Sequence, residues 1–179
     1  MEDLPAGQTA IPYSEVVRVK RGPDGKVQSY RVRIIAGGHR QVEGVNYTES
    51  FSAAAKMPTV RAVLANAAHQ DWEIKHVDVK SAYLIALLKE TIYMKAPRGV
   101  LKPGEEGKVL RLLKGLYGLK QAGRGWYMEM MRVFIKELGF ERSVIDHSVY
   151  YRCKGEEHTI VAVATDDMAL TSKRAEDAQ

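Results

Sequence analysis

Cysteine is nearly absent from this sequence, since Cys153 is the only one among 179 residues. A single thiol excludes a disulfide framework and a cysteine-rich zinc module, and it favours a reducing, intracellular setting. The chain also lacks any run of about 18 apolar residues, so we expect no membrane span. Residues 1–5 are acidic and contain no apolar stretch, which argues against a signal peptide.

Acidic residues are scarce in two long stretches of the chain. Hydrophobic residues make up 45% and charged residues 27%, a composition typical of one ordinary globular domain, with a net charge of +5. Residues 16–40 contain seven Lys or Arg against one acid, and residues 108–132 contain six against one. These stretches indicate a polyanionic partner such as nucleic acid or nucleotide phosphate. Two solvated faces without a partner are the alternative.

Residues 1–14 are rich in turn formers and are expected to be a loose leader. Two β-rich runs, 15–21 and 27–35, follow it and flank a Gly-Pro-Asp-Gly turn, which predicts a β-hairpin. On the second run, apolar residues alternate with Arg31 and Arg33. One face of the hairpin should therefore be apolar, while the other presents two guanidinium groups.

The rest of the chain mixes strands and helices without regular alternation, which predicts the α+β class. Pro58 stands where a helix can begin, because its missing N–H costs nothing in the first turn. A second helix should follow Gly125, since apolar residues recur at helical spacing from Trp126 to Leu138. Short strands are expected at 72–79, 91–94, 109–113, 149–153, 159–164 and 168–170.

Two acidic features stand at the ends of expected strands. Asp166 and Asp167 terminate the apolar run 160–164, and Asp78 ends the run 72–77. Carboxylates from two neighbouring strands can hold hard divalent cations such as Mg²⁺, and a two-metal site needs ions about 3.5–4 Å apart. The alternative is a hairpin turn, which favours Asp, together with an isolated surface carboxylate at position 78.

An aromatic residue and a glycine-containing loop complete the candidate features. Tyr83 follows Asp78 by five residues and could offer a flat surface to a sugar, although a core aromatic is the alternative. In the segment 116–121, Gly118 permits close approach of the backbone to a ligand. Lys120 would then lie near a phosphate. The alternative for this segment is a plain connection between a strand and a helix.

Several short blocks occur in the order and spacing of a known family. They are Tyr30–Gly38, Gln41 to Ser52, Asp78–Leu84, Ile92–Met94, Pro97–Gly99, Leu116–Ala122, Arg124–Trp126, Gly139 to Asp146, and Asp166-Asp167. Taken together they resemble the reverse transcriptase of copia-type (pseudoviral) LTR retrotransposons. The resemblance extends over about residues 14–172.

The resemblance implies an α+β fold made of the fingers and palm of a right-hand polymerase. A mixed, mainly antiparallel sheet with packed helices is expected. The reverse transcriptase domain would cover residues 15–179, with fingers at about 15–77 and a palm with fingers insertions at about 78–179. The palm would be incomplete at its C-terminal end, before the primer-gripping segment and the thumb.

The resemblance also assigns roles to individual residues. Asp78, Asp166 and Asp167 match the acids that bind two Mg²⁺ or Mn²⁺ ions and catalyse attack of a primer 3′-OH on the α-phosphate. The other matched residues contact the nucleotide. They are Arg31 and Arg33 at the triphosphate, Tyr83 as the steric gate against a ribose 2′-OH, Tyr117 beside the templating base, and Lys120 behind it.

The expected activity is RNA-directed DNA polymerisation, with a template–primer of RNA or DNA and dNTPs as partners. The resemblance places the protein inside the cell, in cytoplasmic virus-like particles or in the nucleus. The rest of a retrotransposon polyprotein, with RNase H and integrase, is expected but absent from this chain. A catalytically inactive nucleic-acid-binding remnant is the alternative, and a functionless fragment is a third reading.

The chain departs from the family pattern in five places. An aromatic residue usually stands two before the acid pair, where this chain has Ala164. The other departures are Ile85-Ala86 for Asn-Gly, Gly37 for a basic residue, Gly123 for Pro, and Ser52-Ala53-Ala54 for Ser-Pro-Val. Each change removes a residue that would stiffen or shape the pocket around the three acids.

Overall fold

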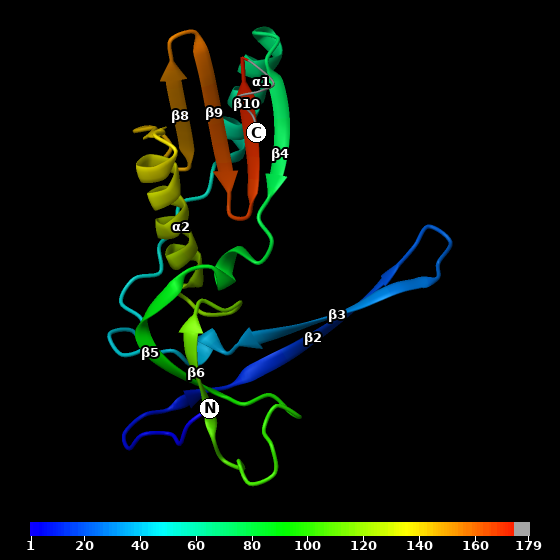
Figure 1. Cartoon of the computed structure of the whole chain (residues 1–179), viewed down its shortest axis with the longest axis vertical. Helices are drawn as coiled ribbons and strands as arrows, with labels where there is room; N and C mark the ends of the chain where they lie inside the picture. The colour runs from blue at the N-terminus through cyan, green and yellow to red at the C-terminus, as the bar shows by residue number, and fades with distance from the viewer. Residues whose placement is uncertain (174–179) are drawn as a thin grey trace. The chain divides into compact units, whose positions relative to one another are not determined.

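The structure, a computed structural model, describes residues 1–173 and folds into two compact units (Figure 1). Unit 1 contains Met1–Ser50 and Ala86–Gly125, and unit 2 contains Phe51–Ile85 and the chain from Trp126 onward. The chain therefore passes between the units after residues 50, 85 and 125. The predicted boundary between residues 77 and 78 differs from all three, because the strand that ends at Asp78 pairs with the C-terminal strand of unit 2.

Unit 1 combines a long hairpin with a small three-stranded sheet. The hairpin pairs β2 (Tyr13–Arg21) with β3 (Val27–Ala36), as the sequence predicts. In the small sheet, β5 (Leu87–Lys95) lies between β6 (Val109–Lys114) and the parallel strand β1 (Ala10–Ile11).

The prediction of a loose leader at residues 1–14 is wrong for part of that segment. Glu2 forms an antiparallel bridge with Val109, and Ile11 of β1 is only 2% exposed. Removing the apolar side chain of Ile11 from water stabilises the pairing of β1 with β5. Glu2 and Ala10–Ile11 therefore pair with the small sheet of unit 1.

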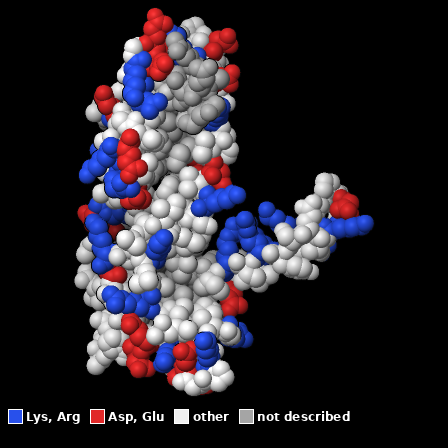
Figure 2. Space-filling view, viewed as in Figure 1, with Lys and Arg blue, Asp and Glu red and all other residues white. Residues whose placement is uncertain are grey.

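The two faces of the β2–β3 hairpin have opposite character. Cross-strand pairs Val17–Val32 and Val19–Tyr30 form one face, which confirms the predicted alternation. This apolar face is exposed, with 71% of Tyr30 accessible. The other face carries the directly opposed pair Arg18–Arg31 and the neighbouring Arg33 and Lys20. Figure 2 shows Lys and Arg side chains along this hairpin.

Unit 2 is built on a five-stranded antiparallel sheet in the order β4-β10-β9-β8-β7. Figure 1 shows the first four of these strands side by side. These strands are β4 (Glu73–Asp78), β7 (Glu141–Arg142), β8 (Val149–Lys154), β9 (Glu157–Ala164) and β10 (Asp167–Ser172). Helix α1 (Met57–His69) precedes β4 and has Pro58 in its first turn, as predicted.

Both faces of the central strand β9 are covered. Val161 and Val163 belong to a buried cluster with aromatic residues of α2, whereas Ala162 packs with Val63 of α1. Successive side chains of a strand point to opposite faces, so α2 and α1 cover opposite sides of the sheet. This explains why residues 160–163 are continuously apolar.

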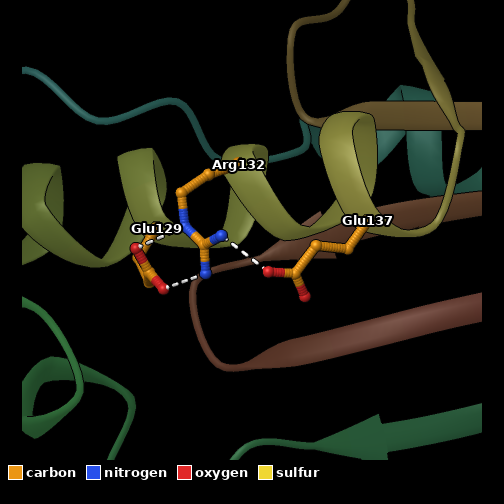
Figure 3. A network of polar contacts seen from close by, with 3 residues as sticks. All are labelled: Glu129, Arg132 and Glu137. Atoms are coloured by element: carbon orange, nitrogen blue, oxygen red, sulfur yellow. Dashed lines mark hydrogen bonds and ion pairs between the residues drawn. The ribbon is translucent and has the colours of Figure 1, made fainter.

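Helix α2 (Ala122–Arg132) begins four residues earlier than predicted and continues into a π-helical turn (Val133–Glu137). Gly125 lies inside this helix and close to Ala86. A side chain at position 125 would be crowded, because its Cβ would lie 3.2 Å from the Cβ of Ala86. Arg132 joins the two segments by bonding Glu129 and Glu137 (Figure 3). Its hydrogen bonds to Glu129 lower the pKa of that carboxyl. Within residues 1–173, no helix is long and apolar enough to cross a bilayer.

A buried carboxylate ties α1 to the loop before β8. Asp146 accepts hydrogen bonds from the N–H of Lys56 (3.2 Å), the N-cap of α1, and from the N–H of Ser148 (3.0 Å). Burial alone would raise the pKa of Asp146, but bonds from Ser148, Thr59 and Lys56 outweigh it and hold the pKa below its usual value. Asp146 thus serves as a cap supplied from outside the helix.

Candidate functional site

The acid pair lies in a tight turn between β9 and β10. Thr165 and Asp166 are the two loop residues of this hairpin, and Asp167 pairs with Ala164 as the first residue of β10. Thr165 has φ +63°, a left-handed conformation that is uncommon for a β-branched residue. Its carbonyl accepts a hydrogen bond from the indole Nε1 of Trp126 at 2.7 Å, which helps to hold this strained turn.

The third candidate acid stands directly beside this turn. In the β4–β10 ladder, Asp78 is the cross-strand partner of Asp167. One residue further, the N–H of Val79 donates to the carbonyl of Asp166 at 2.9 Å. The two strand ends that the sequence predicts to carry acids are therefore hydrogen-bonded neighbours in one sheet.

The side chains of Asp78 and Asp167 share one face of the sheet, because directly opposed residues in an antiparallel pair do so. His76, two residues before Asp78, shares that face, and its Nε2 lies 2.9 Å from Oδ1 of Asp167. Among residues 1–173, no three His, Cys, Asp or Glu side chains converge as a metal cage. The donor atoms nevertheless fit Mg²⁺ or Mn²⁺ in kind, since both prefer carboxylate oxygens.

Tyr83 lies in a 3₁₀ turn (Ala82–Leu84) five residues beyond Asp78. It is half-buried and packs against the cluster that contains Ala82, Trp126 and Met168. The turn therefore rests on the same core that supports the acid-bearing turn. The structure combines features of both sequence readings, because the ring is packed on the core and also partly accessible.

The remaining candidates, Arg31, Arg33, Tyr117 and Lys120, belong to unit 1. Arg31 faces Arg18 across the hairpin, and Arg33 faces Val16. Like charges that are directly opposed disfavour strand pairing, so this face is suited to an anionic partner that offsets the repulsion.

Tyr117 and Lys120 lie on a loop that is held against the end of β3. The carbonyl of Tyr117 accepts from the N–H of Ala36 at 2.7 Å. Gly118 has φ +91°, and a Cβ there would meet the Ala36 carbonyl oxygen at 2.2 Å. The ammonium of Lys120 lies 5.3 Å from the ring centroid of Tyr47, a cation–π distance. Both candidate residues thus have fixed backbone positions within unit 1.

Three residues around these candidates were not predicted from the sequence. The signal for His76 is its spacing, since residues two apart on a strand share a face. Gln41 and Gln121 occur in the family-like blocks, but nothing in their spacing indicates that their buried side chains bond each other at 2.9 Å. That pairing joins residues 80 positions apart and depends on the fold.

The family described as "Reverse transcriptase (RNA-dependent DNA polymerase)" matches residues 1–178. The chain is 36% identical over 172 residues to the Pol polyprotein from transposon TNT 1-94 of Nicotiana tabacum, covering 96% of this chain and 13% of that protein. It is 34% identical over 167 residues to the Pol polyprotein from transposon RE1 of Arabidopsis thaliana, covering 93% and 11%.

A more distant relative is the transposon Ty1-BL Gag-Pol polyprotein of Saccharomyces cerevisiae, 29% identical over 150 residues and covering 81% of this chain and 8% of that protein. No solved structure matches the chain. The chain thus spans 8–13% of the length of these three relatives. With the family match over nearly all residues and the predicted strand-end acids brought together in one sheet, the chain belongs to the reverse transcriptase family, in its copia-type branch.

Proposed function

We propose that this chain contributes the catalytic acids and the nucleotide contacts of an RNA-directed DNA polymerase. Reverse transcriptases generally use divalent metal ions, and here Asp78, Asp166 and Asp167 would hold two, Mg²⁺ or Mn²⁺. The ions would lower the pKa of the attacking 3′-OH and neutralise the leaving diphosphate. The chain's own contribution is to present three carboxylates on adjacent strand ends.

The observation that carries this proposal is the ladder register of unit 2. Asp78 is paired with Asp167, and the N–H of Val79 donates to the carbonyl of Asp166, so the three acids stand at neighbouring strand ends of one sheet. A sheet gains nothing from opposed carboxylates in the absence of a cation. A metal-binding role accounts for their placement, whereas a simple turn would require neither Asp78 nor the ladder contact.

In this proposal unit 2 corresponds to the palm and unit 1 to the fingers. Tyr83, packed on the core of unit 2, would act as the steric gate. The nucleotide contacts of unit 1 would be Arg31 and Arg33 with the triphosphate, and Tyr117 and Lys120 near the base. The expected substrates are dNTPs and an RNA or DNA template–primer. The remaining enzymes of a Pol polyprotein would act with this domain.

Extension of a labelled primer on an RNA template tests the proposal directly. The full chain with Mg²⁺ should add dNTPs to the primer. Asp166→Asn should abolish extension, because a neutral amide replaces the charged carboxylate that would hold the ions. The matched control is Asp3→Asn, an exposed acid outside the site, which should extend at the wild-type rate. Equal extension by wild type and Asp166→Asn would refute the catalytic assignment.

A second candidate function is nucleic-acid binding without catalysis. The specific observation in its favour is the basic face of the hairpin, where Arg18 and Arg31 oppose each other beside Arg33 and Lys20. Phosphate contacts make the logarithm of the affinity fall linearly with the logarithm of the salt concentration, with a slope of about −0.7 per contact for single strands. This alternative predicts salt-dependent binding without extension, unchanged in Asp166→Asn and with a smaller salt slope in Arg18→Gln.

A further inference from the structure

Two buried amide side chains connect the loop of Tyr117 and Lys120 to a distant segment of unit 1. Gln41 and Gln121 are each only 6% exposed. Nε2 of Gln41 donates to Oε1 of Gln121 at 2.9 Å, and Oε1 of Gln41 accepts from the N–H of Lys120 at 2.8 Å. A buried amide that lost either partner would carry a desolvation cost.

The orientation of both amides is set by their neighbours. Nε2 of Gln121 donates to the carbonyl of Asn46 at 2.8 Å and lies 3.4 Å from Oε2 of Glu90. Both neighbours are acceptors, so Oε1 of Gln121 must face Gln41, which must then donate. This leaves Oε1 of Gln41 for the N–H of Lys120, a donor that cannot be reversed.

The loop is consequently fixed at two points. The carbonyl of Tyr117 is bonded to the end of β3, and the N–H of Lys120 is bonded to Gln41. Between them, Gly118 has no space for a side chain, and a Cβ on Gly38 would lie 1.9 Å from the Gly118 carbonyl oxygen. The two fixed residues are the same two that the proposed function places at the nucleotide.

We propose that Gln41 is a positioning residue for nucleotide binding, which holds the 117–120 loop through its paired amide without touching the nucleotide. This inference rests on the proposed function. An apolar pair of the same shape would avoid burying two amides, but it would leave the N–H of Lys120 and the carbonyl of Asn46 without these partners. The amide pair differs from it by specifying one loop geometry, since its donors and acceptors match in one arrangement only.

The test compares Gln41→Leu, the double variant Gln41→Leu with Gln121→Leu, and the control Gln28→Leu on the exposed surface of β3. Amide hydrogen exchange of Lys120 reports the loop, and steady-state primer extension reports KM for dNTP separately from kcat. Both Gln41 variants should exchange the Lys120 amide at least tenfold faster. KM should rise about tenfold with kcat within about twofold, and the control should match wild type.

The double variant separates positioning from stability. Gln41→Leu alone leaves Oε1 of Gln121 buried without its donor, and replacing both amides removes that oxygen. The N–H of Lys120 and the carbonyl of Asn46 still lose their partners, so resistance to urea should recover only in part while KM stays raised. Recovery of KM together with stability would overturn the proposal, and so would an unchanged KM or an unchanged Lys120 exchange rate in Gln41→Leu. If the wild-type chain extends no primer, the proposed function fails, while the exchange result still decides whether Gln41 holds the loop.

Discussion

Asp78, the last residue of β4, is the direct cross-strand partner of Asp167, the first residue of β10. Two carboxylates in this relationship repel each other, and the His76 contact to Asp167 offsets part of that repulsion. The sheet therefore retains an unfavourable charge pair at the end where the β9–β10 turn carries Asp166. A bound divalent cation would convert this repulsion into a shared interaction.

Neutralising one member of this pair should have opposite effects without and with metal. Without divalent ions, Asp78→Asn should raise the free energy of unfolding by roughly 0.2–1 kcal/mol, near the lower end because Asp78 is exposed. With saturating Mg²⁺, wild type should gain stability by mass action, about 2.7 kcal/mol at 100 times Kd, and the variant should gain less. Urea unfolding with EDTA or Mg²⁺ measures both, and equal gains would contradict the prediction.

A methyl group at Gly118 should disrupt the end of β3. The residue has φ +91°, and its Cβ would lie 2.2 Å from the Ala36 carbonyl oxygen. Gly44 has φ +78° with nothing within 4 Å of its Cβ position, so Gly44→Ala is a matched control. The control should cost about 1–2 kcal/mol for the left-handed conformation, and Gly118→Ala clearly more. Equal losses in thermal or urea unfolding would show that the contact is unimportant.

The buried carboxylate of Asp146 should give stability a pH dependence. Its pKa in the folded chain is lowered, so it binds fewer protons there than in the unfolded chain, where the pKa is about 3.9. The stability it contributes is therefore fully present above that value and is lost as pH falls through the lower folded pKa. Asp146→Asn should cost about 1 kcal/mol at neutral pH and flatten this part of the curve. Asp3→Asn should retain the wild-type acid slope, and the same slope in Asp146→Asn would refute the assignment.

The hydroxyl of Tyr150 is a buried polar group without a hydrogen-bond partner among the described residues. Its ring stacks on that of Phe134, with the ring centroids 4.8 Å apart. Burial is the main cause that raises the pKa of Tyr150 to about 12, and the nearby Tyr127 raises it further. Tyr150→Phe should leave the free energy of unfolding unchanged or raise it by about 1 kcal/mol. Tyr150→Ala should lower it by about 3–5 kcal/mol. A large loss in Tyr150→Phe would show that the hydroxyl is satisfied.

Local features of the fold follow from local sequence patterns. The hairpin at 15–35, the helix start at Pro58 and the strand ending at Asp78 each depend on neighbouring residues, and the structure has all three. The placement of Asp166 and Asp167 at a turn is of the same kind, because an apolar strand ends in residues that favour turns.

Long-range features do not follow from such patterns. The pairing of β4 with β10 joins segments about 90 residues apart, and it places β4 in the same compact unit as the strands after residue 126. The alternation around Tyr30 correctly predicts an apolar face but gives no information on what covers it. Likewise, Gly123 and Gly125 disfavour helix by propensity, yet both lie inside α2, where Gly125 permits close packing on Ala86.

The central claim is that the strand-end acids of unit 2 form a divalent metal site, and paramagnetic Mn²⁺ tests it most directly. Amide NMR signals of the full chain should broaden selectively at residues 78–79 and 165–167 on Mn²⁺ titration. This broadening should disappear in Asp166→Asn and persist in Asp3→Asn. Broadening centred elsewhere, or unchanged broadening in Asp166→Asn, would contradict the account.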